Sequence, residues 1–155
     1  MNRKKLVIER VFNAPIEKVW HAITTPDMLV KWWYPNGMSN SHISVDLCEG
    51  GKFRYCFSNQ SGKAFWGIGI YQTIDEPAYL SYLDNFTDEN GNAVPPSYYG
   101  MPGDEVIPTL VEFTFSSDGD RTQFTLTMEN LFDEKITRGM TQGWNSMFDH
   151  LKSEL

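Results

Sequence analysis

Histidine and cysteine are the residue types of this chain that could bind a metal ion or supply a nucleophile. His21, His42 and His150 are scattered, and none stands at a zinc-ligand spacing from another histidine, cysteine or carboxylate pair. For His21 a structural role is favoured over a catalytic one. Cys48 and Cys56 also lack metal spacing and suggest no basic partner, so we expect two reduced, structural thiols. The sequence therefore predicts no metal site.

Glycine motifs for phosphates and cofactors are missing from the sequence. There is no G-x-S-x-G, no phosphate-binding loop and no dinucleotide fingerprint. Gly67 and Gly69 lack the third glycine of that fingerprint and fall in a predicted strand, where glycines mark a bulge, a bend or the close approach of another group. We therefore expect no cofactor.

Three charged residues in predicted strands are candidates for polar anchors of a bound ligand. Asp46, Arg54 and Glu112 all lie opposite in phase to their apolar neighbours. The favoured interpretation is that their face of the sheet points outward and the charges are solvated. If a curled sheet instead turned them inward, one of them could orient a carboxyl or hydroxyl group of a ligand.

Aromatic residues are abundant and could form the wall of an apolar cavity. Five Trp, seven Tyr and ten Phe make up 14% of the chain. Large rings line pockets, but they also fill cores, and each residue could equally belong to a solid core. Methionines adapt to varied partners and mildly favour a promiscuous site. The predicted wall consists of Trp32, Trp33, Tyr55, Phe57, Trp66, Tyr82, Tyr98, Tyr99, Phe113, Phe115, Met140, Gly143, Trp144 and Met147.

The C-terminal stretch 133–155 must position the last part of this wall. Its apolar residues recur every three or four positions, which predicts one face of a helix, and Asp133 is a plausible N-cap. Gly139 and Gly143 lie inside the pattern, where each costs about 1 kcal/mol relative to alanine. We expect either a strand or a ligand to approach the helix backbone there. The sequence favours neither ordinary close packing on a sheet nor the approach of a ligand over the other.

Apolar periodicity predicts a strand, two short helices, six further strands and this long helix. The first helix starts with Pro15 as its first residue and breaks at 25–27, and the second spans 26–33. The expected strands are 6–12, 43–47, 53–57, 65–74, 78–86, 110–116 and 123–129.

The stretch 87–108 has no sustained period. It holds four of the eight prolines, and its Tyr98, Tyr99 and Met101 are apolar enough to close over a cavity. A lid and a mobile surface loop are equally weighted.

Composition limits the class of protein. The 155 residues suit one domain, 1–155, with an apolar fraction of 41%. The net charge of −7 argues against nucleic acid and anionic membranes as partners. No apolar run is long enough for a membrane span, and the stretch after the basic N-terminus is too short for a signal peptide. We expect a cytoplasmic protein, and contact with a second copy of the chain stays open.

The order of several motifs resembles a known superfamily. The run 12–20, FNAPIEKVW, resembles the opening of START-like, or SRPBCC, proteins. Trp32-Trp33, the run 50–53 (GGKF), Gly67 and Gly143-Trp144 resemble the branch named after the C-terminal domain of the activator of the heat shock protein 90 ATPase. The resemblance implies an α+β helix-grip fold, a curved antiparallel sheet of about seven strands wrapped around the long helix and a hydrophobic cavity.

Three functions follow as hypotheses. The leading one is binding of a small hydrophobic or amphipathic molecule, such as a lipid, between helix and sheet, without catalysis. A chaperone-interacting or stress-response role is the second; since the activators that name the branch carry an additional N-terminal domain and this chain starts at its first strand, we expect it less. The third is a cyclase- or hydrolase-like enzyme using Arg54, Asp46 or His21 in the cavity.

Overall fold

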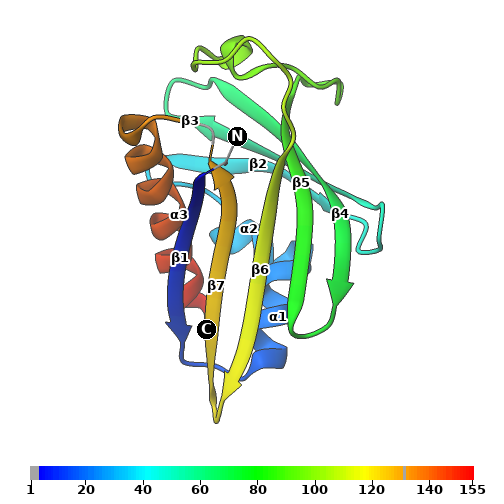
Figure 1. Ribbon diagram of the computed structural model, residues 1–155, viewed down its shortest axis with the longest axis vertical. Coiled ribbons are helices and arrows are strands. Elements are labelled where there is room, and N and C mark those ends of the chain that lie inside the picture. The colour runs from blue at the N-terminus through cyan, green and yellow to red at the C-terminus, as the bar shows by residue number, and fades with distance from the viewer. Residues whose placement is uncertain (1–3, 131) are drawn as a thin grey trace.

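The computed structural model describes residues 4–130 and 132–155, which form a curled antiparallel sheet with a long helix against its inner face (Figure 1). Its strands are β1 (Lys4–Phe12), β2 (Met38–Val45), β3 (Lys52–Asn59), β4 (Ala64–Asp75), β5 (Tyr79–Thr87), β6 (Thr109–Asp118) and β7 (Arg121–Asn130). The helices are α1 (Ile16–Thr24), α2 (Pro26–Trp32), the short 3-10 helix η1 (Pro96–Tyr99) and α3 (Glu134–Glu154).

The sheet runs in the order β1-β7-β6-β5-β4-β3-β2, and every neighbouring pair is antiparallel. The last strand therefore pairs with the first, and the rest of the sheet is a meander from β2 to β7. This arrangement confirms the predicted helix-grip α+β fold with seven strands.

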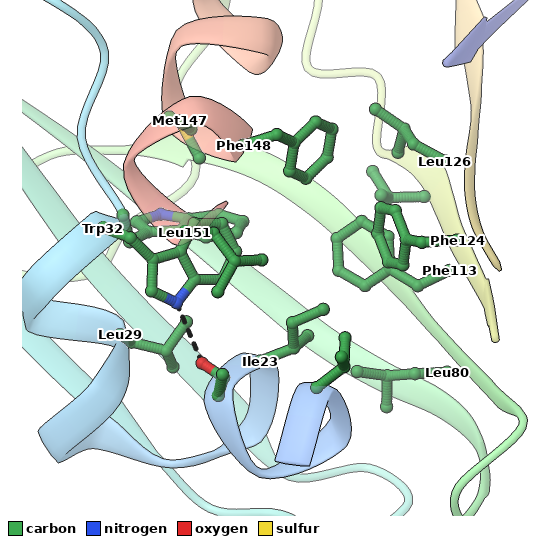
Figure 2. Close-up of a cluster of buried hydrophobic side chains, with 14 of the residues drawn as sticks. Ile23, Leu29, Trp32, Leu80, Phe113, Phe124, Leu126, Met147, Phe148 and Leu151 are labelled. Carbon is green, nitrogen blue, oxygen red and sulfur yellow. Dashed lines mark hydrogen bonds between the residues drawn. The ribbon is translucent and has the colours of Figure 1, made fainter. Parts of the chain in front are cut away.

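The two short helices connect the opposite edges of the sheet, because they lie between β1 and β2 in sequence. Pro15 is the N-cap of α1, one position before the predicted place, and the cap has no side-chain hydrogen bond. Trp32 ends α2, and its indole N–H donates to the carbonyl oxygen of Ala22 at 2.9 Å (Figure 2, dashed line). This buried bond fixes the angle between the two helices.

The predicted N-cap of α3 is confirmed, since the Asp133 carboxylate accepts a hydrogen bond from the backbone N–H of Ile136 at 3.0 Å. The buried residues of α3 all belong to its C-terminal half: Ser146, Met147, Phe148 and Leu151. In Figure 2 three of them point into the same cluster as Trp32 of α2 and Phe113 and Phe124 of the sheet. None of the helices in the described residues is both long and apolar enough to cross a membrane.

One strand differs from its prediction. The strand predicted at 43–47 begins earlier, at Met38, and ends at Val45, so that Leu47 lies after it and is exposed. Hydrogen bonds within the turn, from Cys48 N to Asp46 O and from Gly51 N to Cys48 O, end the ladder before Leu47.

Replacing Phe148 by Ala tests the role of this cluster. Phe148 is fully buried and its ring contacts Phe12, Phe124, Trp32 and Trp144. The substitution should lower the free energy of unfolding by about 3–5 kcal/mol, measured by urea denaturation. Lys152→Ala, on the exposed face of the same helix, should change it by about 0.5 kcal/mol or less. Equal losses for the two variants would contradict this account of the core.

Candidate functional site

A cavity of about 1050 Å³ lies between the N-terminal half of α3 and the inner face of β3, β4 and β5. Most side chains along it are apolar, and many are aromatic or methionine. One side is closed by Pro35, which lies between α2 and β2, and by Met38 at the start of β2. Another side is closed by residues 101–105, in the long connection before β6. This is the ordinary form of a small-molecule site.

The missing side chains of Gly67 and Gly69 on β4 shape the floor of the cavity. A Cβ atom at Gly67 would lie within 3.0 Å of the Tyr55 ring, and one at Gly69 within 3.0 Å of the Tyr82 ring. The two tyrosines come from β3 and β5, on either side of β4. Because β4 has glycine at both positions, their rings can lie over it, and the Tyr55 hydroxyl reaches across to β5.

That hydroxyl meets Asp84, a carboxyl group on the cavity floor. Tyr55 Oη donates a hydrogen bond to Asp84 Oδ1 at 2.6 Å. Asp84 is only half-buried by exposed area, because part of its side chain faces the cavity rather than other protein atoms. The pair is therefore a polar point in a wall that is otherwise mainly apolar.

The environment makes Asp84 titrate near neutral pH. Removal from bulk water raises the pKa of Asp84 to about 7, against the opposing effects of the hydrogen bonds from the Tyr55 hydroxyl and the backbone N–H of Asn85. Burial raises the pKa of both Tyr55 and Tyr82 well above the usual range, so these phenols stay protonated. Asp84 is thus the floor group whose charge changes at physiological pH.

A cap covers one end of the cavity, and its backbone forms the loop at the top of Figure 1. We use this word for residues 88–108, which include η1. Buried Tyr99 fastens it: its hydroxyl donates to the Thr87 carbonyl at 2.5 Å and accepts from the Trp66 N–H at 3.0 Å. Arg54 holds the beginning of the cap through the Glu89 carbonyl, at 3.3 Å. The loop predicted at 87–108 is thus tied to three strands, β3, β4 and β5.

The two glycines of α3 face open space. A Cβ atom at Gly139 or Gly143 would have no protein atom within 4 Å apart from its own helix neighbours, and both residues line the cavity. No strand approaches the helix there, so close packing on the sheet does not explain these glycines. They widen the cavity instead.

Nine of the predicted wall residues line the cavity. Trp66 does so from the end of β4, while its ring packs on the outer face against Arg54 and His42, at centroid distances of 4.6 and 5.4 Å. The nine are Trp33, Tyr55, Phe57, Trp66, Tyr82, Met140, Gly143, Trp144 and Met147.

Five predicted wall residues lie elsewhere. Trp32, Phe113 and Phe115 belong to the solid core below the cavity, where the rings of the sheet meet α1, α2 and the C-terminal half of α3. Tyr98 is 59% exposed on the cap. Tyr99 is buried beneath the cap as its anchor, against Phe65 and Phe86.

The three predicted polar anchors do not line the cavity either, and neither does His21. Asp46 is exposed in the turn after β2, and Arg54 packs on Trp66 on the outer face. Glu112 accepts a hydrogen bond from the Tyr79 hydroxyl at 2.6 Å. Arg54 and Glu112 alternate with buried neighbours and point away from them, whereas Asp46 lies just after the end of β2, next to exposed Leu47.

Asp84 was missed by the sequence analysis, although a signal existed. In β5 it stands in phase with Leu80, Tyr82 and Phe86, so period-two alternation places it on the same face as these apolar residues. A charged residue that falls at the same alternating positions as the apolar residues of a strand is expected to point to the inner face of the sheet, as Asp84 does.

Histidines and cysteines take no part in the cavity. His150 stacks on Tyr34 and hydrogen-bonds its carbonyl oxygen, Cys48 is exposed and Cys56 buried, both as free thiols. Within the residues that the structure describes, no three His, Cys, Asp or Glu side chains gather as a metal site would require.

Residues 13–155 match the family described as Activator of Hsp90 ATPase homolog 1-like protein. The chain belongs to this family. The match includes both helices before β2, every strand from β2 on and the whole of α3. It confirms the resemblance inferred from the sequence motifs. The curated proteins contain no match to this chain.

Solved structures of several bacterial proteins share the fold. Protein Ms6760 from Mycobacterium smegmatis is 24% identical with a TM-score of 0.79, over 100% of this chain and 96% of the other. Protein CV1439 from Chromobacterium violaceum is 20% identical, also with a TM-score of 0.79, over 98% and 97%. The AHSA1 protein from Silicibacter pomeroyi is 19% identical, with a TM-score of 0.76 over 97% and 96%. At such identities the likeness shows the fold alone.

Replacing Asp84 by Asn should change how stability depends on pH. The folded-state pKa of about 7 lies above the value of about 3.9 for an unfolded Asp. The folded state therefore holds the proton more tightly, and this contribution is present below about pH 4 and lost as pH rises through 7. From pH 4 to 8 the free energy of unfolding of the wild type should fall by roughly 1–3 kcal/mol relative to Asp84→Asn, in urea titrations.

Asn85→Ser, a neutral change at the next position of β5, is the control and should leave the pH slope as in the wild type. A constant difference between wild type and Asp84→Asn from pH 4 to 8 would contradict the described environment of Asp84.

Proposed function

We propose that this protein binds a small, largely hydrophobic organic molecule in the cavity between α3 and the sheet. The observation that carries the proposal is the apolar cavity of about 1050 Å³, which is large enough for a ligand of metabolite size. No catalytic step is included, because the residues considered for an enzyme lie outside the cavity.

The wall suits a molecule with rings or a branched apolar body. Trp33 and Trp144 meet edge to face at 5.5 Å, and Trp33 meets Tyr55 in the same way at 5.7 Å. Such contacts hold the rings rigidly, so that little side-chain entropy remains to be lost on binding. Met140 and Met147 are flexible and can adapt to the ligand's outline.

The glycines of α3 support the proposal on energetic grounds. Glycine inside a helix costs about 0.5–1 kcal/mol relative to alanine, and here the open space beside it leaves room for a larger side chain. The chain thus gives up helix stability where the only structural effect is a wider cavity. Losses of this kind are typical of binding sites.

Gly143→Leu is the direct test. The new side chain should occupy the cavity and weaken binding of N-phenyl-1-naphthylamine, a neutral apolar probe, at least about tenfold by fluorescence titration. The free energy of unfolding should stay unchanged or rise by about 0.5–1 kcal/mol, because leucine is the better helix former.

Gln142→Leu is the matched control, since it introduces the same residue at the next, exposed position, which does not line the cavity. It should leave probe affinity within about twofold of the wild-type value. Wild-type protein that binds no probe, or a Gly143→Leu variant that loses stability but keeps probe affinity, would argue for a sealed core. If the probe results support binding, native mass spectrometry of protein purified from its own host would identify the bound molecule.

A further inference from the structure

All charged side chains that line the cavity are acidic. Asp84 lies on the floor, while Asp104 and Glu105 of the cap and Asp133 at the start of α3 stand around the opening. Among the described lining residues there is no Lys, Arg or His. The lining therefore offers negative charge at the opening and on the floor of the cavity. Two cations, Lys63 at 5.1 Å from the Phe65 ring and Arg54 at 4.6 Å from the Trp66 ring, lie against rings of the lining but are not themselves part of it.

A series of aromatic rings begins at Asp84 and can attract cations. Tyr55 binds the Asp84 carboxylate directly through its hydroxyl, and its ring neighbours that of Trp33, which neighbours that of Trp144. All three rings line the cavity. The negative faces of Trp and Tyr rings attract an ammonium group within about 6 Å, most strongly where water is excluded.

We infer that the ligand carries an amine, and that its ammonium group lies beside Asp84, against the rings of Tyr55 and Trp144. The inference rests on the proposed function and adds the chemical class: an organic cation with an apolar body. The Tyr55 hydroxyl and the Asn85 N–H use two of the roughly four acceptor positions of the Asp84 carboxylate, which leaves positions for the N–H groups of an amine.

The same arrangement disfavours an anionic ligand such as a fatty acid. A ligand carboxylate beside Asp84 would place two like charges in a poorly hydrated space, so that one of them would have to take up a proton. The three acidic groups at the opening and the net charge of −7 would also repel an incoming anion. A neutral hydroxyl group can bind Asp84, but without the charge attraction.

The proton on Asp84 gives the inference a second readout. The titratable groups next to Asp84 are Tyr55 from β3 and Tyr82 from β5. Its register partners are Gly69 of β4 and Thr109 of β6, and the residues of α3 that line the cavity are uncharged. The remaining charges, at the opening, are all acidic. An ammonium group would stabilise the ionised Asp84, so amine binding near pH 7 should release on the order of half a proton.

Three probes with the same ring test the charge preference: 1-naphthylmethylamine, 1-naphthylmethanol and 1-naphthoate. At pH 8 the amine should bind at least about tenfold more tightly than the carboxylate, with the alcohol between them, by isothermal titration calorimetry. Repeating the amine titration at pH 7 in phosphate and in Tris buffers should show proton release, and amine affinity should rise from pH 5.5 to 8.

Asp84→Asn should lower amine affinity about tenfold while alcohol affinity stays within about twofold. Asp120→Asn, an exposed position in the turn between β6 and β7 that does not line the cavity, is the control and should leave amine affinity within about twofold of the wild-type value. If the Asn variant does not fold, proton release by the wild-type protein still decides.

The outcomes separate the two proposals. If the carboxylate binds as tightly as the amine, or if amine binding at pH 7 releases no proton to the buffer, the cation inference is overturned and the cavity is a general apolar site. If none of the naphthyl probes binds and N-phenyl-1-naphthylamine does not bind either, the proposed function itself fails.

Discussion

The contacts that fix α3 are concentrated in its C-terminal half. Arg10 of β1 binds Asp149 at 2.7 Å, the Asn36 N–H donates to Ser146 Oγ at 3.1 Å, and His150 binds the Tyr34 carbonyl at 3.1 Å. Together with the buried face of Figure 2, these contacts hold one half of the helix against the core. The other half is tied mainly at its start, where Asn130 binds Thr137 at 2.7 Å. Because α3 is held mainly at its two ends, its first half can stand away from the sheet, and the cavity lies between this half and the sheet.

The cost of removing groups from water limits what the cavity can contain. The floor combines tyrosine rings, which favour an apolar ligand, with a carboxyl group that would be costly to keep ionised without a partner. The structure limits this cost by letting Asp84 hold its proton near neutral pH and by giving it the Tyr55 hydroxyl. The polar group is therefore tolerated when the cavity holds no partner and can become charged when a suitable one arrives.

Much of the fold could be predicted from the sequence, because each element carries a strong local pattern: alternation for the strands, the 3.6-residue period and Asp133 cap for α3. Phase also separated outward from inward charges, and Glu112 points outward as its phase indicates. The same rule, applied to a charge in phase with an apolar face, identifies Asp84 as an inward residue. The position of the cap could not be predicted, because it depends on contacts with strands distant in sequence: Tyr99 with Trp66 of β4, and Glu89 with Arg54 of β3. Periodicity also does not distinguish residues that line the cavity from residues of the solid core. Phe113 and Tyr82 both point to the inner face of the sheet, but only Tyr82 lines the cavity.

The open space beside Gly139 and Gly143 has a consequence for how such a binding site can diversify. In most cores a larger side chain forces neighbouring residues to shift, so changes of specificity need several substitutions together. Here each position can accept a side chain without meeting another part of the protein, and the added atoms would subtract directly from the cavity. A single substitution at either position would therefore narrow the cavity and stabilise the helix at the same time. At these positions cavity size and helix stability are coupled in opposite directions, so a wider cavity costs stability.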